Sequence, residues 1–172
     1  MTSPGPPLQV MSLRIVVGAL AGGAVLMAAV AGILNGFDER PGATWLGVLL
    51  AGSVLCWLLA LTVGFRVPAI EPGSPHVERQ AMSALTSSTV QRTMLTEAPA
   101  ILGLVLSFAS GSGLVAVIGL LTVPVMLWLS WPSRANVAKV ERRVDAKGAQ
   151  SGLSEALFGQ GSGPTGGAML PH

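Results

Sequence analysis

Four long runs of apolar residues constrain this chain more than any other feature of its sequence. They cover residues 15–34, 43–65, 94–109 and 114–131, and only the third contains a charged side chain. A helix needs about 20 mostly apolar residues to cross the hydrocarbon core of a bilayer. The runs do not alternate polar and apolar residues, as the strands of a membrane barrel do. The sequence therefore predicts an all-α integral membrane protein with four transmembrane helices.

The composition of the chain agrees with a surface that faces lipid. Only 10% of the 172 residues are charged, whereas soluble domains have about 25%. The net charge of +2 gives no strong attraction to nucleic acid. Cys56 is the only cysteine, so no intrachain disulfide can form. Since His76 and His172 lie far apart, we expect neither a metal site nor a bound cofactor.

Lysine and arginine gather on one side of the predicted spans. Nine of the ten lie before the first span, between the second and third, or after the fourth, and only Arg40 lies in a loop on the other side. Because cytoplasmic segments are enriched in Lys and Arg, we expect a multi-pass membrane protein with both termini cytoplasmic and short external loops. One alternative is a cleaved signal peptide, with Arg14 as its charged region and residues 29–31 as its cleavage site. Cleavage would leave three spans.

Small residues recur at helical spacing in the first predicted span. Gly18 and Gly22 are four residues apart, and Ala24, Ala28 and Gly32 continue the spacing. Such residues allow two helix backbones to approach closely in lipid. They predict either packing within the bundle or association with a second copy of the chain.

The segments outside the membrane have weaker signals. The prolines of residues 1–10 argue against a helix, and we expect residues 1–14 to be a flexible N-terminal segment. Residues 77–92 predict a short helix on the inner surface that leads into the third span. Residues 159–172 are rich in Gly, Ser and Pro and are predicted to be disordered.

The segment that follows the fourth span, residues 132–158, is basic. Val137, Val140 and Val144 form a narrow apolar stripe with lysine and arginine around it. One interpretation is a basic amphipathic helix that lies on anionic lipid headgroups. The other is a solvated helix that continues out of the fourth span.

Glu97 is the one charged residue within the apolar runs, and an ionisable group inside a span is a candidate for function. Thr96 is a possible helix N-cap, which would put Glu97 in the first turn and Pro99 at the third helical position. Carboxylates and prolines are both tolerated there, because the first N–H groups have no helical partner. The alternative is one long helix from residue 77 with a kink at Pro99.

Two roles for Glu97 follow from its depth near the inner boundary. It could form an ion pair with Arg14 or Arg66, which we expect at the same boundary, or it could handle ions or protons. Pro99 and Pro124 are predicted to lie at similar depth. Paired kinks at these prolines could open a small polar cavity with Glu97 at its mouth, or the two prolines could be unrelated.

The segment LTEAPAILGLVLSF resembles the carboxylate-bearing helix of rotary ATP synthase c subunits (proteolipids). In this resemblance Glu97 matches the ion-carrying carboxylate, and Gly103, Leu104 and Val105 match the run that follows it.

A second resemblance extends over the whole hydropathy plan. Small bacterial four-span membrane proteins of unassigned function carry an L-x-E-x-P-A-x-x-G-like segment at the start of the third span. Here the matching residues are Leu95, Glu97, Pro99, Ala100 and Gly103. The resemblance implies a location in the inner membrane.

The spans contain few groups that could perform chemistry. They offer Glu97, Cys56 and scattered Ser and Thr, without His or Asp. Because catalysis needs several convergent polar groups, we do not expect an enzyme. The sequence favours a non-enzymatic accessory or structural component of a membrane complex, which binds a membrane-protein partner or a second copy of itself. The alternative is an ion- or proton-conducting oligomer that uses Glu97.

The charge distribution makes a testable prediction of topology. Reporter fusions at Arg40 and in the turn at residues 110–113 should report an external location, and fusions after residue 150 a cytoplasmic one. Paired alkaline phosphatase and fluorescent protein fusions measure this. A cytoplasmic signal at Arg40 would contradict the prediction.

Overall fold

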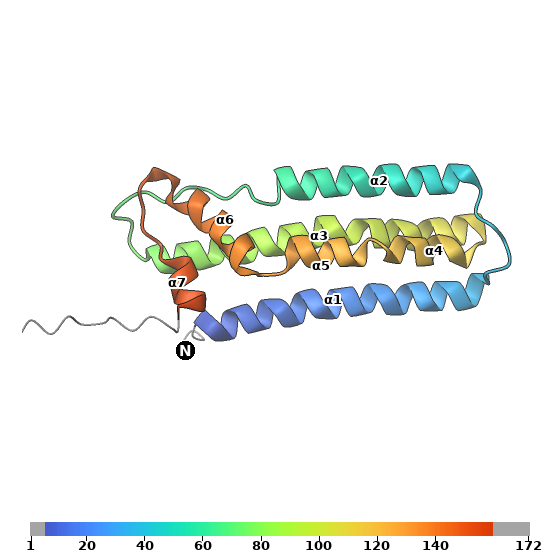
Figure 1. Cartoon of the computed structure of the whole chain (residues 1–172), viewed down its shortest axis with the longest axis horizontal. Coiled ribbons are helices and arrows are strands. Elements are labelled where there is room, and N and C mark those ends of the chain that lie inside the picture. The colour runs from blue at the N-terminus through green and yellow to red at the C-terminus, as the bar shows by residue number, and fades with distance from the viewer. Residues whose placement is uncertain (1–5, 160–172) are drawn as a thin grey trace, which may run out of the picture.

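The computed structural model describes residues 6–159, which form helices and their connections without a strand (Figure 1). The elements are α1 (Pro6–Asn35), α2 (Ala43–Thr62), α3 (Val77–Ser110), α4 (Gly113–Leu120), α5 (Val123–Ser130), α6 (Arg134–Val144), η1 (Asp145–Lys147) and α7 (Leu153–Phe158). Four stretches are long and apolar enough to cross a membrane, namely Val10–Asn35, Ala43–Thr62, Val77–Ser110 and Gly113–Ser130. The prediction of an all-α chain with four potential membrane spans is confirmed. The expected disorder of the C-terminus concerns residues 160–172, which lie outside the described residues.

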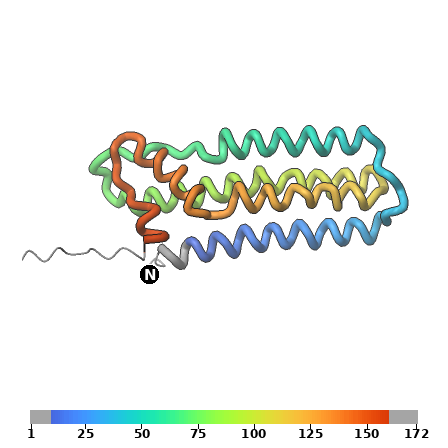
Figure 2. The backbone as a smooth tube through the Cα atoms, viewed as in Figure 1, coloured from blue at the N-terminus to red at the C-terminus, as the bar shows by residue number. Residues whose placement is uncertain are grey.

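The long helices run antiparallel, with α3 and the α4–α5 pair at the centre (Figures 1 and 2). α1 packs on α3, α4 and α5 along one side, while α2 packs mainly on α3 along the other. The start of α1, the loop between α2 and α3, and helices α6 and α7 lie at the same end of the bundle (Figure 1). Nine of the ten lysine and arginine residues belong to these segments, to η1 between α6 and α7, or to the neighbouring part of α3, and we call this the basic end.

The third span is part of one continuous helix. α3 has 34 residues, which at 1.5 Å per residue corresponds to about 51 Å, about 20 Å more than the hydrocarbon core. Thr96 lies in the middle of α3, so the prediction that it caps a new helix is wrong. The alternative of one long helix from residue 77 is confirmed. Pro99 lies within α3, where its missing N–H leaves the carbonyl of Leu95 without a helical donor.

The fourth span is interrupted. α4 ends at Leu120, and α5 begins at Val123 with Pro124 in its first turn. Pro124 has no N–H to donate to the carbonyl of Leu120. Thr122 occupies the break and donates its hydroxyl to the carbonyl of Gly119 at 2.7 Å. The uninterrupted helix expected over residues 114–131 is therefore two helices in series.

The N-terminal helix begins earlier than the sequence suggested. α1 includes residues 6–14, which had been expected to be flexible. Proline is tolerated in the first turn of a helix, since the N–H groups there have no intrahelical acceptor. The composition of residues 1–10 therefore misled the prediction.

Glycine sets the separation of the central helices. A Cβ at Gly103 would lie 3.0 Å from the Cα of Gly119. At the end opposite the basic end, a Cβ at Gly113 would lie 2.7 Å from the Cα of Gly32. Gly113 also donates its N–H to the carbonyl of Gly36 at 2.9 Å. These approaches bring α4 against α3 on one side and against the end of α1 on the other.

The segment after the fourth span folds back onto protein. Val137, Val140 and Val144 of α6 are fully buried in a cluster with Ala81 and Leu85 of α3. Because the stripe is covered by protein, it neither lies on headgroups nor belongs to a solvated continuation of the fourth span. The valine stripe is therefore covered by α3, while contact of the basic side of this segment with anionic headgroups stays a prediction. The predicted helix over residues 77–92 exists as the first turns of α3, and it supplies the surface that the stripe covers.

The close approach at Gly103 predicts a loss of stability on substitution. Gly103→Leu should lower the free energy of unfolding in detergent by about 1–3 kcal/mol, because the new side chain meets the backbone of α4. Thermal unfolding of the purified monomer measures this. Gly22→Leu is the matched control, since a Cβ at Gly22 meets nothing within 4 Å. Equal stability of the two variants would contradict the prediction.

Candidate functional site

A stripe of polar residues on α3 is buried near the basic end. It consists of Ser88, Thr89, Arg92, Thr93 and Thr96, and each is at most 2% exposed. We call these five residues the polar seam. Their spacing of one, three or four residues keeps them on one face of the helix. The seam lies where α3 meets the end of α2 and the end of α5.

Arg92 is the centre of the polar seam. Its Nη1 donates to the carbonyl of Leu129 at 2.9 Å, and its Nε donates to the carbonyl of Ser88 at 3.1 Å. Its Nη2 donates to the hydroxyl of Thr89 at 3.3 Å. The Cζ atom lies 4.2 Å from the centroid of the Phe65 ring. The guanidinium therefore contacts an aromatic face and a helix C-terminus, and it has no carboxylate partner.

The location of Arg92 explains how its charge is tolerated. The last carbonyls of a helix have no intrahelical donor and carry partial negative charge. Arg92 and Asn136 both donate to the carbonyl of Leu129, in the last turn of α5. Asn136 also donates to the carbonyl of Trp131 at 2.9 Å. Side chains from α3 and α6 thus complete the end of α5.

Other members of the seam make neutral contacts. Ser88 donates to the carbonyl of Gly64 at 2.7 Å, which ties α3 to the chain just after α2. The hydroxyls of Thr96 and Ser130 are 3.0 Å apart and join α3 to α5. The seam is therefore a set of satisfied groups that fixes three helices to one another.

Glu97 follows the seam but faces elsewhere. It lines an apolar groove of about 400 Å³ between α1 and α3. The groove is lined by Ala19, Leu20, Gly23, Ala24, Met27, Glu97, Ala100, Ile101 and Leu104. Glu97 is half-buried, and its carboxylate makes neither a hydrogen bond nor an ion pair within residues 6–159. The groove therefore carries a single unpaired acid among apolar residues, of which Ala19, Gly23, Ala24 and Ala100 are small.

The predicted ion pair of Glu97 does not form. Arg14 instead lies with its Cζ 5.8 Å from the centroid of the Trp131 ring, and its Nε is buried without a hydrogen bond. Arg66 is exposed in the loop after α2. The expectation that Arg14 or Arg66 pairs with Glu97 is wrong, since the one ion pair in residues 6–159 joins Lys147 to Glu71.

The two prolines are in different environments. Pro99 is fully buried on α3, whereas Pro124 is exposed on α5. Pro124 is not among the residues that line the groove of Glu97. This groove is built from α1 and α3, so it does not arise from paired breaks at the prolines.

The small residues of α1 differ in burial. Ala28 and Gly32 are buried, and Ala28 packs in a cluster with Ala116 of α4. Gly18 and Gly22 are exposed, and a Cβ at either would meet nothing within 4 Å. Packing within the bundle therefore explains only the second half of the small-residue pattern.

Arg92 was not singled out from the sequence, although a signal exists. It lies in the stretch SSTVQRTMLT, where hydroxyl residues recur at helical spacing with Arg92. An arginine within such a stripe of hydroxyl residues indicates a buried helix face whose polar groups accept its hydrogen bonds. No three His, Cys, Asp or Glu side chains in residues 6–159 come together to hold a metal ion.

Comparison with known proteins adds no assignment. No protein-family model, curated protein sequence or solved structure matches this chain. The resemblances to c subunits and to small four-span proteins therefore stay predictions, and the function has to be argued from the geometry.

The contacts of Arg92 predict a specific requirement for arginine. Arg92→Lys keeps the charge but loses the planar set of donors, so it should lower the free energy of unfolding by about 1–3 kcal/mol. Thermal unfolding in detergent measures this. Arg79→Lys, at an exposed position of the same helix, is the control and should leave stability unchanged. A fully stable Arg92→Lys protein would show that the hydrogen bonds to Leu129 and Thr89 contribute little.

Proposed function

We propose that this chain is a non-enzymatic integral membrane protein of the bacterial inner membrane, with both termini cytoplasmic, that acts as an accessory or structural subunit of a larger complex. The observation that carries the proposal is the groove between α1 and α3. Its partner is a transmembrane helix of another protein that presents a basic or amide side chain to Glu97.

The shape of the groove supports a helix as its occupant. Ala19, Gly23 and Ala24 form much of the α1 wall, and small residues allow a helix backbone to approach closely in lipid. Gly18 and Gly22 extend the exposed small surface of α1 toward a neighbour. Larger side chains at Gly18 and Gly22 would prevent a second helix from approaching the backbone of α1 closely.

The charge of the groove supports a polar group on that helix. An unpaired carboxylate within a span is costly, and acids in spans face a partner or a water-filled cavity. Within the chain, Arg92 is engaged with Leu129 and Phe65 and cannot serve Glu97. A donor from a second protein would satisfy the carboxylate.

A second candidate function is an ion- or proton-conducting oligomer. The same unpaired Glu97 and its resemblance to the c-subunit carboxylate favour it. The groove is otherwise apolar, and Glu97 is the one ionisable residue on its walls. A conducting path would therefore need polar groups from neighbouring copies.

Photo-crosslinking tests the proposed interface. A photoreactive amino acid at Met27, which is exposed in the groove, should capture a specific partner protein in membranes. The same substitution at Leu55, which is exposed on α2 and does not line this groove, is the matched control and should capture none. Glu97→Leu should abolish capture at Met27, because leucine has no acceptor for the partner's donor. Thermal stability should stay unchanged, because Glu97 has no intrachain bond to lose.

Three outcomes would contradict the proposed function. Capture of a second copy of the chain in place of another protein would favour a homo-oligomer. Equal capture at Met27 and Leu55 would remove the groove as an interface. Proton flux through vesicles that contain only this protein, lost in folded Glu97→Gln, would support the conducting oligomer.

A further inference from the structure

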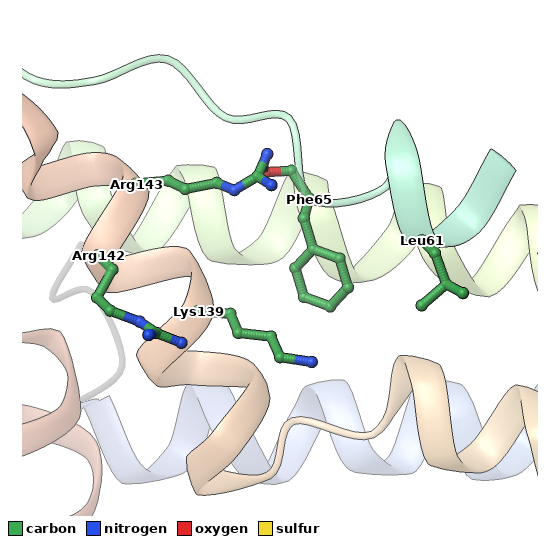
Figure 3. Close-up of a pocket in the computed structure, with 5 residues that line it drawn as sticks. All are labelled: Leu61, Phe65, Lys139, Arg142 and Arg143. Carbon is green, nitrogen blue, oxygen red and sulfur yellow. Dashed lines mark hydrogen bonds between the residues drawn. The ribbon is translucent and has the colours of Figure 1, made fainter. Parts of the chain in front are cut away.

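A second pocket lies at the basic end, where α6 crosses the end of α2. It has a volume of about 410 Å³ and is lined by Leu61, Phe65, Lys139, Arg142 and Arg143 (Figure 3). Figure 3 shows the three basic side chains extending from α6 on the side that faces Phe65 and Leu61. The pocket thus has a cationic wall and an apolar wall.

The cations of this pocket keep most of their hydrogen-bond donors free. Arg143 donates one N–H to the carbonyl of Phe65 at 2.9 Å, and Arg142 donates its Nε to the carbonyl of Ala138 at 3.3 Å. Lys139 lies with its Nζ 5.2 Å from the centroid of the Phe65 ring. Since a guanidinium has five donors and an ammonium three, several remain for a ligand.

The acids near the pocket are committed to other groups. Glu141 accepts from the N–H and the hydroxyl of Ser154. Asp145 accepts from the N–H of Ser151 at 3.1 Å and from its hydroxyl at 3.2 Å. Glu71 pairs with Lys147 at 3.1 Å, in the one ion pair that residues 6–159 contain. The three cations of the pocket therefore lack carboxylate partners.

The helix that carries these cations is fixed to the rest of the bundle. The valine stripe on the other face of α6 is buried against α3. Phe65 is itself buried, and its ring also contacts Arg92. The basic side chains are therefore presented by a helix that is fixed to the bundle.

The apolar wall indicates the kind of anion. Leu61 is exposed in the last turn of α2, one turn after the exposed Leu58. Because α2 is a membrane span, these side chains lie beside lipid acyl chains, and the pocket lies where the headgroups of that leaflet begin. Basic pockets at the end of transmembrane helices are suited to phosphate headgroups.

We propose that this pocket binds the phosphate of one anionic phospholipid, with Lys139, Arg142 and Arg143 contacting the headgroup and Leu61 contacting an acyl chain. The phosphate supplies acceptors for the free donors, and arginine matches its geometry with two parallel hydrogen bonds. The apolar wall favours a lipid over free phosphate. This site is independent of the groove of Glu97 and stands whether or not a partner protein binds there.

Native mass spectrometry of the full-length protein in neutral detergent tests the proposal. Titration with phosphatidylglycerol should give a tightly bound lipid, whereas phosphatidylcholine should bind weakly. Lys139→Gln with Arg142→Gln should weaken phosphatidylglycerol binding about tenfold or more. Arg143 is left intact, because it also supports the backbone at Phe65. The matched control is Arg79→Gln with Lys147→Gln, which removes the same charge outside the pocket and should change binding less than twofold.

Each remaining outcome decides against the proposal. Equal binding of the two lipids would mean that the pocket does not select an anionic headgroup. Equal loss in the two double variants would mean a general attraction to charge. Inorganic phosphate that competes at the same concentration as the lipid would identify a site for free phosphate. If the pocket variant unfolds, the single exposed change Arg142→Glu replaces it, and unchanged phosphatidylglycerol binding by that folded variant would overturn the site.

Discussion

The buried guanidinium of Arg92 connects three helices that are distant in the sequence, α2, α3 and α5. It donates to the carbonyl of Leu129 at the end of α5, contacts the ring of Phe65 after α2, and is carried by α3. Removing a cation from water is costly unless hydrogen bonds and dipoles replace the water. A helix C-terminus and an aromatic face supply them here. The end of α2, the break after α5 and the position of α6 all depend on this arrangement.

The same arrangement separates the two candidate sites. Arg92 directs its Nε, Nη1 and Nη2 to Ser88, Leu129 and Thr89. Glu97 lies five residues further along α3, on a different face of the helix, and faces the groove toward α1. Phe65, held against Arg92, also forms a wall of the basic pocket with Lys139. The unpaired acid therefore lies in a groove facing α1, and the unpaired cations lie in a separate pocket at the basic end, near the end of α2.

Several errors in the sequence-based predictions have one origin. The signals TEAP and Val137–Val140–Val144 were assigned local roles, as a helix start and as a lipid-facing stripe. Thr96 instead bonds to Ser130 within a long helix, and the valines cover the first turns of α3. Similarly, one expected role of Glu97 was an ion pair with Arg14 or Arg66, whereas Arg14 lies near the ring of Trp131. Each prediction rested on the residue spacing within one segment. The role of each residue depended instead on a second segment that packs against the first.

The sequence by itself determined the four apolar spans, their limits to within a few residues for the second and fourth, and the gathering of basic residues at one end. Length and hydrophobicity fix these features, because a bilayer accepts only continuous apolar helices whose backbone is internally bonded. Tertiary structure alone decided which faces meet: the burial of Arg92, the covering of the valine stripe and the direction of Glu97. In lipid, a residue that faces a helix is about as apolar as one that faces acyl chains. Hydrophobic periodicity therefore cannot distinguish the two, and close packing at glycines such as Gly103 and hydrogen bonds such as Ser88 to Gly64 make the choice.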